Sequence, residues 1–205
     1  MYLTIEQSKK LFEEFFENIK IDYTEKFEFL SKLIEGDDWS FVIKSHALIE
    51  SLVTELIVAK ISEIELKKVI ERMPLHGETV SKVSILKIYQ LVTPEEIKFI
   101  CKLSEIRNSI VHKYENIDFT FERYVSTLNT ENKKNWKKLL TNENIDRDKM
   151  EKLILEQPMM AVWFNLFYFI IHSLSTINEI KNIKRLHDEA EITTKEFLKI
   201  IKEHE

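Results

Sequence analysis

The sequence has very little glycine and proline, with only two glycines and three prolines among its 205 residues. Strand-rich folds need these residues in their many tight turns, so their scarcity argues against a β-rich protein. Hydrophobic residues make up 44% of the chain, which is enough for a substantial core. The composition therefore predicts an all-α protein with long helices, and the length is compatible with a single domain over residues 1–205.

Cysteine is almost absent as well, since Cys101 is the only one. A lone cysteine excludes an intramolecular disulfide and is typical of a reducing compartment. The opening stretch, MYLTIEQSKKLFEEFF, carries acidic residues where a signal peptide needs an apolar run, so we expect a cytoplasmic protein. The net charge of −5 argues against a general nucleic-acid coat protein, although a local basic groove is compatible with it.

Two classes of motif are also missing. The sequence has no H-x-x-x-H, H-E-x-x-H or C-x-x-C spacing, which are common metal-binding arrangements. It also lacks G-x-x-x-x-G-K and G-x-G-x-x-G, the glycine-rich loops that hold nucleotide phosphates. We therefore expect neither a metal nor another cofactor.

What the sequence does contain is helical periodicity along most of its length. Asp37 or Asp38 is predicted to cap a long helix that reaches as far as Glu71. A second capping box, of Thr193 and Glu196, predicts a separate C-terminal helix that runs to residue 202. The other helices are predicted at 4–20, 27–34, 80–92, 93–112, from 119 onward, 150–157 and 159–177. Residues 129–149 are mostly polar and predict an insertion or a surface helical hairpin.

The segment 159–177 is the most apolar of the chain. Asn165 and His172 interrupt it, and its fully apolar runs fall well short of the roughly 18 residues that indicate a membrane span. We therefore expect no membrane association. A helix that is apolar nearly all round belongs in the middle of a bundle or at a subunit contact.

The most informative stretch is TPEEIKFICKLSEIRNSIVHKYENIDF, residues 93–119. Its opening T-P-E-E has the pattern of a capping box with proline at the first helical position. Near the predicted helix end lie Arg107, Asn108 and His112, written R-N-x-x-x-H. Asn108 and His112 are one turn apart on nearly the same face. Arg107 lies at the edge of the apolar face, where a charged group is costly unless it has a partner.

This motif, followed by K-Y and a short polar turn, resembles the signature of the HEPN superfamily of small helical proteins. The helix SHALIESL, followed later by PEEIKFICKLSEIRNSIVH, is similar to the mannitol-repressor-type branch of that superfamily. The resemblance covers about residues 38–125. It implies a HEPN-like helical bundle with a core at about 38–128 plus 150–178 and additional helices at both ends.

HEPN proteins that are ribonucleases are understood to cleave RNA without a metal, by attack of a 2′-hydroxyl on the adjacent phosphate. That step needs a group that transfers protons near neutral pH and a cation that stabilises charge on the phosphate. The resemblance implies that His112 transfers protons, that Arg107 stabilises the transition state, and that Asn108 orients the phosphate or His112. It also implies an RNA substrate, a homodimer whose two motifs share one cleft, and an antitoxin or regulatory partner if the protein is the toxin of a defence or toxin–antitoxin system.

A structural interpretation of the same residues stays open. Arg107 could pair with Glu50 or Glu105, and His112 could favour the dipole at the helix end. Members of the mannitol-repressor-type branch look like regulators or interaction modules. The motif would then cleave nothing.

His46 and Glu50 pose a similar choice, because they lie one turn apart on the apolar stripe of the helix that starts near Asp38. They are either a core histidine held by a carboxylate or a supporting pair in which Glu50 fixes the direction of Arg107.

A cluster of basic residues surrounds one tryptophan in the polar segment 129–149. Such a cluster could hold a nucleic-acid backbone with one base stacked on the ring, or it could be a solvated helix face. Its members are Lys133, Lys134, Trp136, Lys137 and Lys138.

Overall fold

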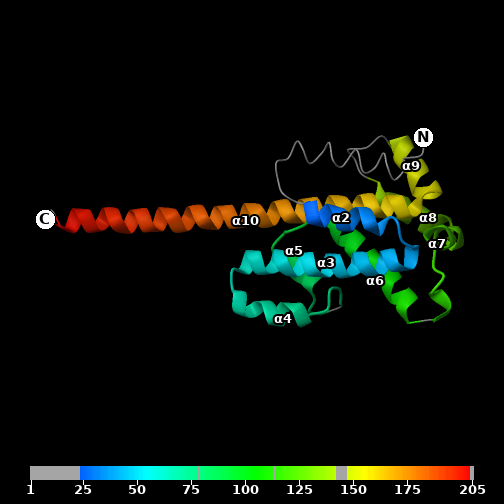
Figure 1. Cartoon of the computed structure of the whole chain (residues 1–205), viewed down its shortest axis with the longest axis horizontal. Coiled ribbons are helices and arrows are strands. Elements are labelled where there is room, and N and C mark those ends of the chain that lie inside the picture. The colour runs from blue at the N-terminus through cyan, green and yellow to red at the C-terminus, as the bar shows by residue number, and fades with distance from the viewer. Residues whose placement is uncertain (1–23, 78, 113, 142–146, 204–205) are drawn as a thin grey trace. The chain divides into compact units, whose positions relative to one another are not determined.

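The computed structural model describes residues 24–77, 79–112, 114–141 and 147–203 (Figure 1). Within these ranges the regular elements are all helices and no strand occurs, so the all-α prediction is confirmed for this part of the chain. The helix predicted at 4–20 lies outside the described residues.

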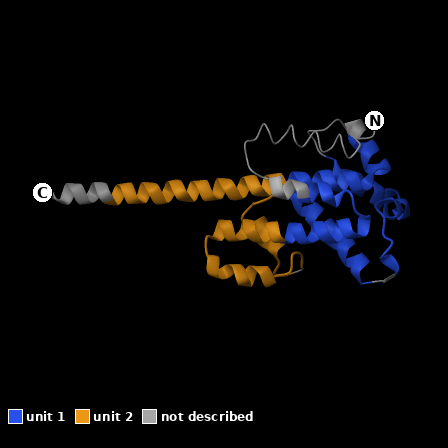
Figure 2. Cartoon of the chain, in the orientation of Figure 1, with its two compact units in different colours: residues 1–50, 93–169 blue, residues 51–92, 170–205 orange. Residues whose placement is uncertain are grey.

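The chain divides into two compact units (Figure 2). The first comprises residues 1–50 and 93–169, and the second comprises residues 51–92 and 170–205. Two helices, α3 (Asp38–Ile61) and α10 (Pro158–Glu203), contribute residues to both units. The single domain over 1–205 stays a prediction.

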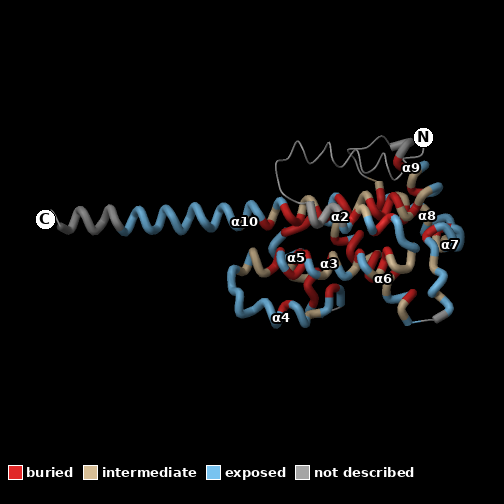
Figure 3. Tube along the Cα trace, in the orientation of Figure 1, coloured by how far each residue is buried: buried red, intermediate tan, exposed pale blue. Residues whose placement is uncertain are grey.

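The first unit has its apolar core on α3, α6 and α10 (Figure 3). Its described elements are α2 (Thr24–Leu33), the start of α3, α6 (Pro94–Val111), η2 (Tyr114–Asn116), α7 (Phe121–Thr127), α8 (Thr130–Leu140), α9 (Arg147–Glu156) and the start of α10. Side chains buried almost completely include Phe41, Val42, Ile49, Ile100, Leu103, Trp163, Leu166 and Phe169. Each contributes about 1.5–3 kcal/mol by leaving water, so packing rather than helix propensity holds these helices in place.

The first turns of α10 also satisfy the ends of two other helices in this unit. Nε1 of the buried Trp163 donates to the carbonyl of Leu30, in the last turn of α2, at 3.0 Å. Nδ2 of Asn165 donates to the carbonyl of Leu140, the last residue of α8, at 3.1 Å. The last four carbonyls of a helix have no partner inside it, and burying one unpaired costs about 1–3 kcal/mol. The polar interruption at Asn165 is therefore explained by its contact with α8.

Two adjacent carboxylates at the start of α3 have different roles. Asp37 is the cap, because its Oδ1 accepts from the backbone N of Ser40 at 2.8 Å and its Oδ2 from Oγ of Ser40 at 2.7 Å. These bonds lower the pKa of Asp37. Asp38 instead reaches the start of α7, where its Oδ2 accepts from the backbone N of Phe121 at 2.6 Å. Burial raises the pKa of Asp38 and outweighs this hydrogen bond, while the charges of Glu122 and Asp37 raise it further.

The helix α8 takes part in the core of the first unit. Trp136 is 3% exposed, and Leu140 is fully buried. The Trp136 ring lies 5.5 Å from that of Tyr124 and 6.4 Å from that of Phe121, measured between centroids. Two side chains of α8 thus complete the core, while its other residues are exposed or half-buried, and the insertion or surface hairpin at 129–149 stays a prediction.

The second unit shows where α3 ends. It contains the end of α3, η1 (Ile64–Leu66), α4 (Lys67–Arg72), α5 (Lys82–Ile88) and the rest of α10. The prediction that α3 reaches Glu71 is wrong, because the helix stops at Ile61. The next residue, Ser62, has a φ of 63°, the left-handed conformation that commonly closes a helix. Neither glycine nor proline marks this break in the sequence.

The two shorter α-helices of the second unit also have satisfied ends. After α5, Gln90 has a φ of 51°, and the backbone N of Leu91 donates to the carbonyl of Leu86 at 3.0 Å, as in a Schellman motif. At the end of α4, the carbonyl of Glu71 accepts from Nζ of Lys82 at 3.3 Å. Lys82 is 1% exposed, so this basic side chain is an internal contact rather than a surface charge.

The helix α10 runs unbroken from Pro158 to Glu203, so the prediction of a separate C-terminal helix is wrong. The hydroxyls of Thr193 and Thr194 donate to the carbonyls one turn earlier, at 2.9 and 2.8 Å, and thus sit inside the helix. By length and composition alone, a window of α10 within Pro158–Lys195 is apolar enough to cross a membrane. The structure buries 61% of that window inside the protein. A buried core helix of a soluble protein meets the same criteria of length and composition, so this finding is weak evidence for a membrane span.

Candidate active site

The helix α6 carries Arg107 and Asn108 of the R-N-x-x-x-H motif. The cap at its start and its buried apolar face determine where the helix begins and which way its side chains point. At the start, Oγ1 of Thr93 accepts from the backbone N of Glu96 at 3.2 Å, and Oε2 of Glu96 accepts from the backbone N of Thr93 at 2.7 Å. This confirms the predicted capping box. The side chains that α6 buries are Ile97, Phe99, Ile100, Leu103, Ser104, Ile106 and Ile110. Their burial sets the rotation of the helix, and therefore the direction in which its last turn faces.

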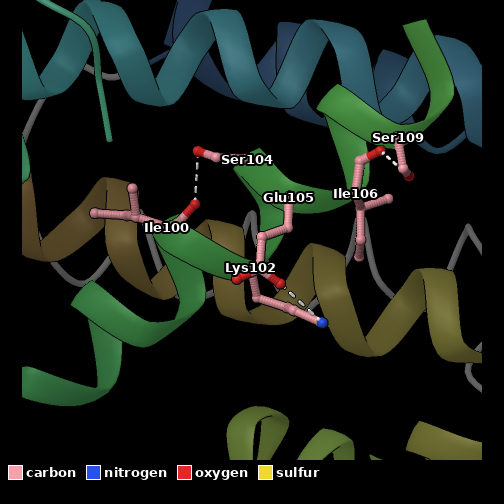
Figure 4. A network of polar contacts seen from close by, with 6 residues as sticks. All are labelled: Ile100, Lys102, Ser104, Glu105, Ile106 and Ser109. Atoms are coloured by element: carbon pink, nitrogen blue, oxygen red, sulfur yellow. Dashed lines mark hydrogen bonds and ion pairs between the residues drawn. The ribbon is translucent and has the colours of Figure 1, made fainter. Parts of the chain in front are cut away.

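Small polar contacts run along the middle of α6 (Figure 4). Oγ of Ser104 donates to the carbonyl of Ile100 at 2.9 Å, and Nζ of Lys102 donates to Oε2 of Glu105 at 3.0 Å. Burial lowers the pKa of Lys102, but the hydrogen bonds and negative charges of Glu105 and Tyr124 outweigh this, and the net pKa is raised. Glu105 is thus the partner of Lys102, which disfavours the interpretation in which Glu105 neutralises Arg107.

Arg107 and Asn108 lie near the end of α6, His112 is its C-cap, and none of the three is buried. Nη1 of Arg107 donates to Oδ1 of Asn108 at 3.0 Å, which holds the guanidinium beside the amide. Arg107 is half-buried, whereas Asn108 and His112 are exposed. His112 is the C-cap of α6, with a φ of −90° and a ψ of −3°. A ligand in solvent can therefore reach a cation, an amide and an imidazole within little more than one turn of helix.

The electrostatics at this helix end favour cations. The C-terminal carbonyls of α6 carry a partial negative charge that stabilises a positive side chain and opposes an anion. One of these carbonyls, that of Ser109, accepts from Nδ2 of Asn116 at 2.8 Å, which brings η2 back over the helix end. Two exposed acidic residues, Glu115 and Asp118, follow in the chain. A phosphate at this site would depend on the guanidinium of Arg107 to outweigh these negative charges.

His46 and Glu50 lie one turn apart on the part of α3 that belongs to the first unit, and both are half-buried. Neither is sealed in the core like Ser45 or Ile49 on the same helix. Their role as a support for Arg107 stays a prediction.

The basic residues of α8 do not form the predicted cluster around a free aromatic ring. Trp136 is 3% exposed, so its face is not available to stack on a base, which disfavours the stacked-base alternative and leaves that of a solvated helix face. Nζ of Lys137 is paired with Oε2 of Glu151 at 3.2 Å, which reduces its local positive charge. Lys134 and Lys138 are exposed and Lys133 is half-buried. A contact of these lysines with an RNA backbone stays a prediction.

An apolar crevice lies between α6, α8 and α10 in the first unit. It is lined by Phe99, Lys102, Leu103, Ile106, Trp136, Leu139, Leu140 and Val162. Its lining is apolar apart from Lys102 and the indole N–H of Trp136, and it is too small for a substrate. Among the described residues, no group of three or more His, Cys, Asp or Glu side chains could hold a metal ion.

Sequence reasoning missed two contacts that polar side chains make between helices, those of Asp38 and Lys82. Asp38 joins α3 to α7, and Lys82 joins α5 to α4. The partner of Asp38 lies 83 positions away along the chain, and no local spacing could have indicated it. Comparison of the chain with protein-family models, with curated proteins and with solved structures gave no match.

Proposed function

We propose that this protein is a HEPN-type, metal-independent endoribonuclease, the effector of a defence or toxin–antitoxin system. One observation carries the proposal. Arg107, Asn108 and His112 lie within six residues at the end of α6, none of them is buried, and a hydrogen bond joins Arg107 to Asn108. Supporting it is the sequence resemblance of residues 38–125 to the mannitol-repressor-type branch.

The chemistry assigned to these residues is proton transfer with charge stabilisation. His112 removes the proton of the attacking 2′-hydroxyl or delivers one to the leaving 5′-oxygen. Arg107 binds two non-bridging phosphate oxygens with its planar fork and stabilises the charge that develops on them. Asn108 holds the guanidinium through its Oδ1 and offers its Nδ2 to the phosphate. The products are a 2′,3′-cyclic phosphate and a 5′-hydroxyl, so no water and no metal enters the first step.

The test uses the purified full chain with a mixture of single-stranded RNA in excess chelator. We expect fragments that end in cyclic phosphates, and we expect Arg107→Ala and His112→Ala each to lower the rate by about 100-fold or more, as is typical when a proton-transfer or charge-stabilising group is lost. Arg123→Ala and His76→Ala are matched controls, because these residues are an exposed arginine and an exposed histidine that are not part of the motif. Equal cleavage by the motif variants and the controls would exclude this function.

A second candidate is a regulator or interaction module of the mannitol-repressor type. The observation that favours it is the run of exposed residues 181–195 on α10, which includes large apolar side chains. This candidate predicts no RNA turnover, and binding of a partner that persists in Arg107→Ala and His112→Ala.

A further inference from the structure

A short segment follows α6 and begins with His112, the exposed C-cap of that helix. Of the described residues at 115–118, all but Asn116 are exposed, and Asn116 is half-buried. The last four carbonyls of a helix have no partner inside it, so an exposed helix end frays unless other groups bind them. The position of His112 therefore depends on what closes this end of α6.

Asn116 closes the end of α6 from outside the helix. Its Nδ2 donates to the carbonyl of Ser109 at 2.8 Å, and that carbonyl is one of the last four of α6. Oγ of Ser109 donates in turn to the carbonyl of Ile106 at 2.7 Å (Figure 4). A side-chain amide thus provides the donor that a backbone N–H provides in the common C-terminal caps.

Asn116 is also held from its other side. Its backbone carbonyl accepts from the backbone N of Phe119 at 3.1 Å. The Phe119 ring lies 5.2 Å from that of the fully buried Phe121 and 6.2 Å from that of Tyr124, measured between centroids. The segment that begins with His112 therefore has the packed helix α6 before it and an aromatic cluster after it, and the amide of Asn116 joins the two.

We propose that Asn116 is a positioning residue, which holds the end of α6 closed and thereby fixes His112 relative to Arg107. The bond between Asn116 and Ser109 joins residues seven positions apart, and His112 lies between them. Arg107 and Asn108 precede Ser109 and hydrogen-bond to each other, so their own geometry does not depend on Asn116. The effect on the position of His112 is structural, whereas the effect on catalysis rests on the proposed ribonuclease function.

Asn116→Asp removes the donor with almost no change of size. A carboxylate cannot donate a hydrogen bond at neutral pH, and it would face a carbonyl at the negative end of a helix. Proton transfer needs an imidazole within hydrogen-bond reach of the reacting oxygen, and a displacement of about 1 Å can lower a rate about 100-fold. We therefore expect kcat for RNA cleavage to fall about tenfold or more. KM should change less than about threefold, because Arg107 and Asn108 still bind the phosphate.

Three further variants distinguish the loss of the donor from other effects. Asn116→Ala also removes the donor but adds no charge, and it should show the same selective fall in kcat. Asn116→Gln keeps the donor on a side chain that is one methylene longer, and it should retain most of the natural rate. The matched control is Asn182→Asp, the same change on an exposed asparagine of α10. Circular dichroism checks that each variant is folded.

Backbone NMR relaxation at His112 measures the closure of the helix end without any RNA. In the natural chain we expect an order parameter near the rigid value of about 0.85, and in Asn116→Asp and Asn116→Ala a value below about 0.6. Arg107 should stay rigid in every variant, because the packed part of α6 holds it.

The two measurements distinguish failure of this proposal from failure of the ribonuclease function. An order parameter at His112 that both Asn116→Asp and Asn116→Ala leave unchanged would overturn the positioning role, whether or not RNA is cleaved. A mobile His112 with kcat no lower than in Asn182→Asp would also overturn it, because catalysis would then not depend on the closed helix end. A natural chain that cleaves no RNA would refute the ribonuclease function alone, and the relaxation data would still decide whether Asn116 holds His112 in place.

Discussion

Replacing Asp38 by alanine would remove the acceptor of a buried backbone donor. Oδ2 of Asp38 lies 2.6 Å from the backbone N of Phe121, whose side chain is fully buried at the start of α7. An unpaired buried donor costs about 1–3 kcal/mol, and hydrogen bonds to a charged acceptor are at the upper end of that range. We therefore expect Asp38→Ala to lower the free energy of unfolding by about 2–3 kcal/mol.

Asp38→Asn distinguishes the effect of the acceptor oxygen from that of the negative charge, because it keeps the first and removes the second. The amide oxygen of asparagine can still accept from Phe121, so the contact between α3 and α7 is kept. The lost negative charge has two opposing effects at this position: the start of α3 favours it, by about 0.3–1 kcal/mol, whereas burial opposes it. Because the net pKa of Asp38 is raised, with burial as its largest cause, burial outweighs the favourable contacts. We expect Asp38→Asn to be close to neutral or slightly stabilising at pH 7.

The raised pKa of Asp38 also determines how its contribution to stability changes with pH. A carboxyl group with a raised pKa in the folded state binds its proton more tightly when folded. Its contribution to stability is fully present below the ordinary value of 3.8 and is lost as the pH rises through the folded pKa. The stability of Asp38→Asn relative to the natural chain should therefore increase from pH 3 to pH 7.

Urea unfolding of the three proteins, followed by circular dichroism at several pH values, measures both effects. Asp38→Ala should be clearly less stable than Asp38→Asn throughout. If Asp38→Asn loses as much stability as Asp38→Ala at pH 7, the negative charge rather than the acceptor oxygen holds α3 to α7, and the reasoning fails.

Two further substitutions test helix ends. Gln90→Gly should raise the free energy of unfolding by about 0.5–1 kcal/mol, because Gln90 has a φ of 51° that glycine adopts without strain; urea unfolding checks this, and no gain would contradict the closing role of Gln90. Asn165→Leu should lower it by about 1–2 kcal/mol, because the carbonyl of Leu140 at the end of α8 loses its donor; an unchanged unfolding midpoint would show that water replaces the amide.

Elements with local signals are predicted well from the sequence. The start of α6 is an example, since Thr93, Pro94 and Glu96 lie within four residues and specify the cap by themselves. The Arg107, Asn108 and His112 motif is equally local, because the three residues lie within six positions of the chain at one helix end. Sequence reasoning therefore located this candidate site, and the structure adds its exposure and the bond between Arg107 and Asn108.

Elements that depend on distant contacts are predicted poorly. The break after Ile61 falls on Ser62, a residue with no strong preference for a left-handed conformation. The threonines at 193 and 194 have the composition of a cap, yet the helix around them continues. Trp136 sits among lysines in the sequence, but its burial comes from the neighbouring helices of the first unit, including α6 and α7. In each case the deciding interaction is absent from the surrounding sequence.

The two donors at the start of α10 have a geometric consequence. Trp163 and Asn165 are two residues apart, which is about 200° around a helix, so the ends of α2 and α8 are attached to nearly opposite sides of one rod. The spacing of Trp163 and Asn165 along α10 thus determines the angle between the points at which α2 and α8 are attached. A one-residue insertion between them would rotate one attachment point by about 100° and leave one helix end without its donor. This short interval of the chain should tolerate changes of composition far better than changes of length.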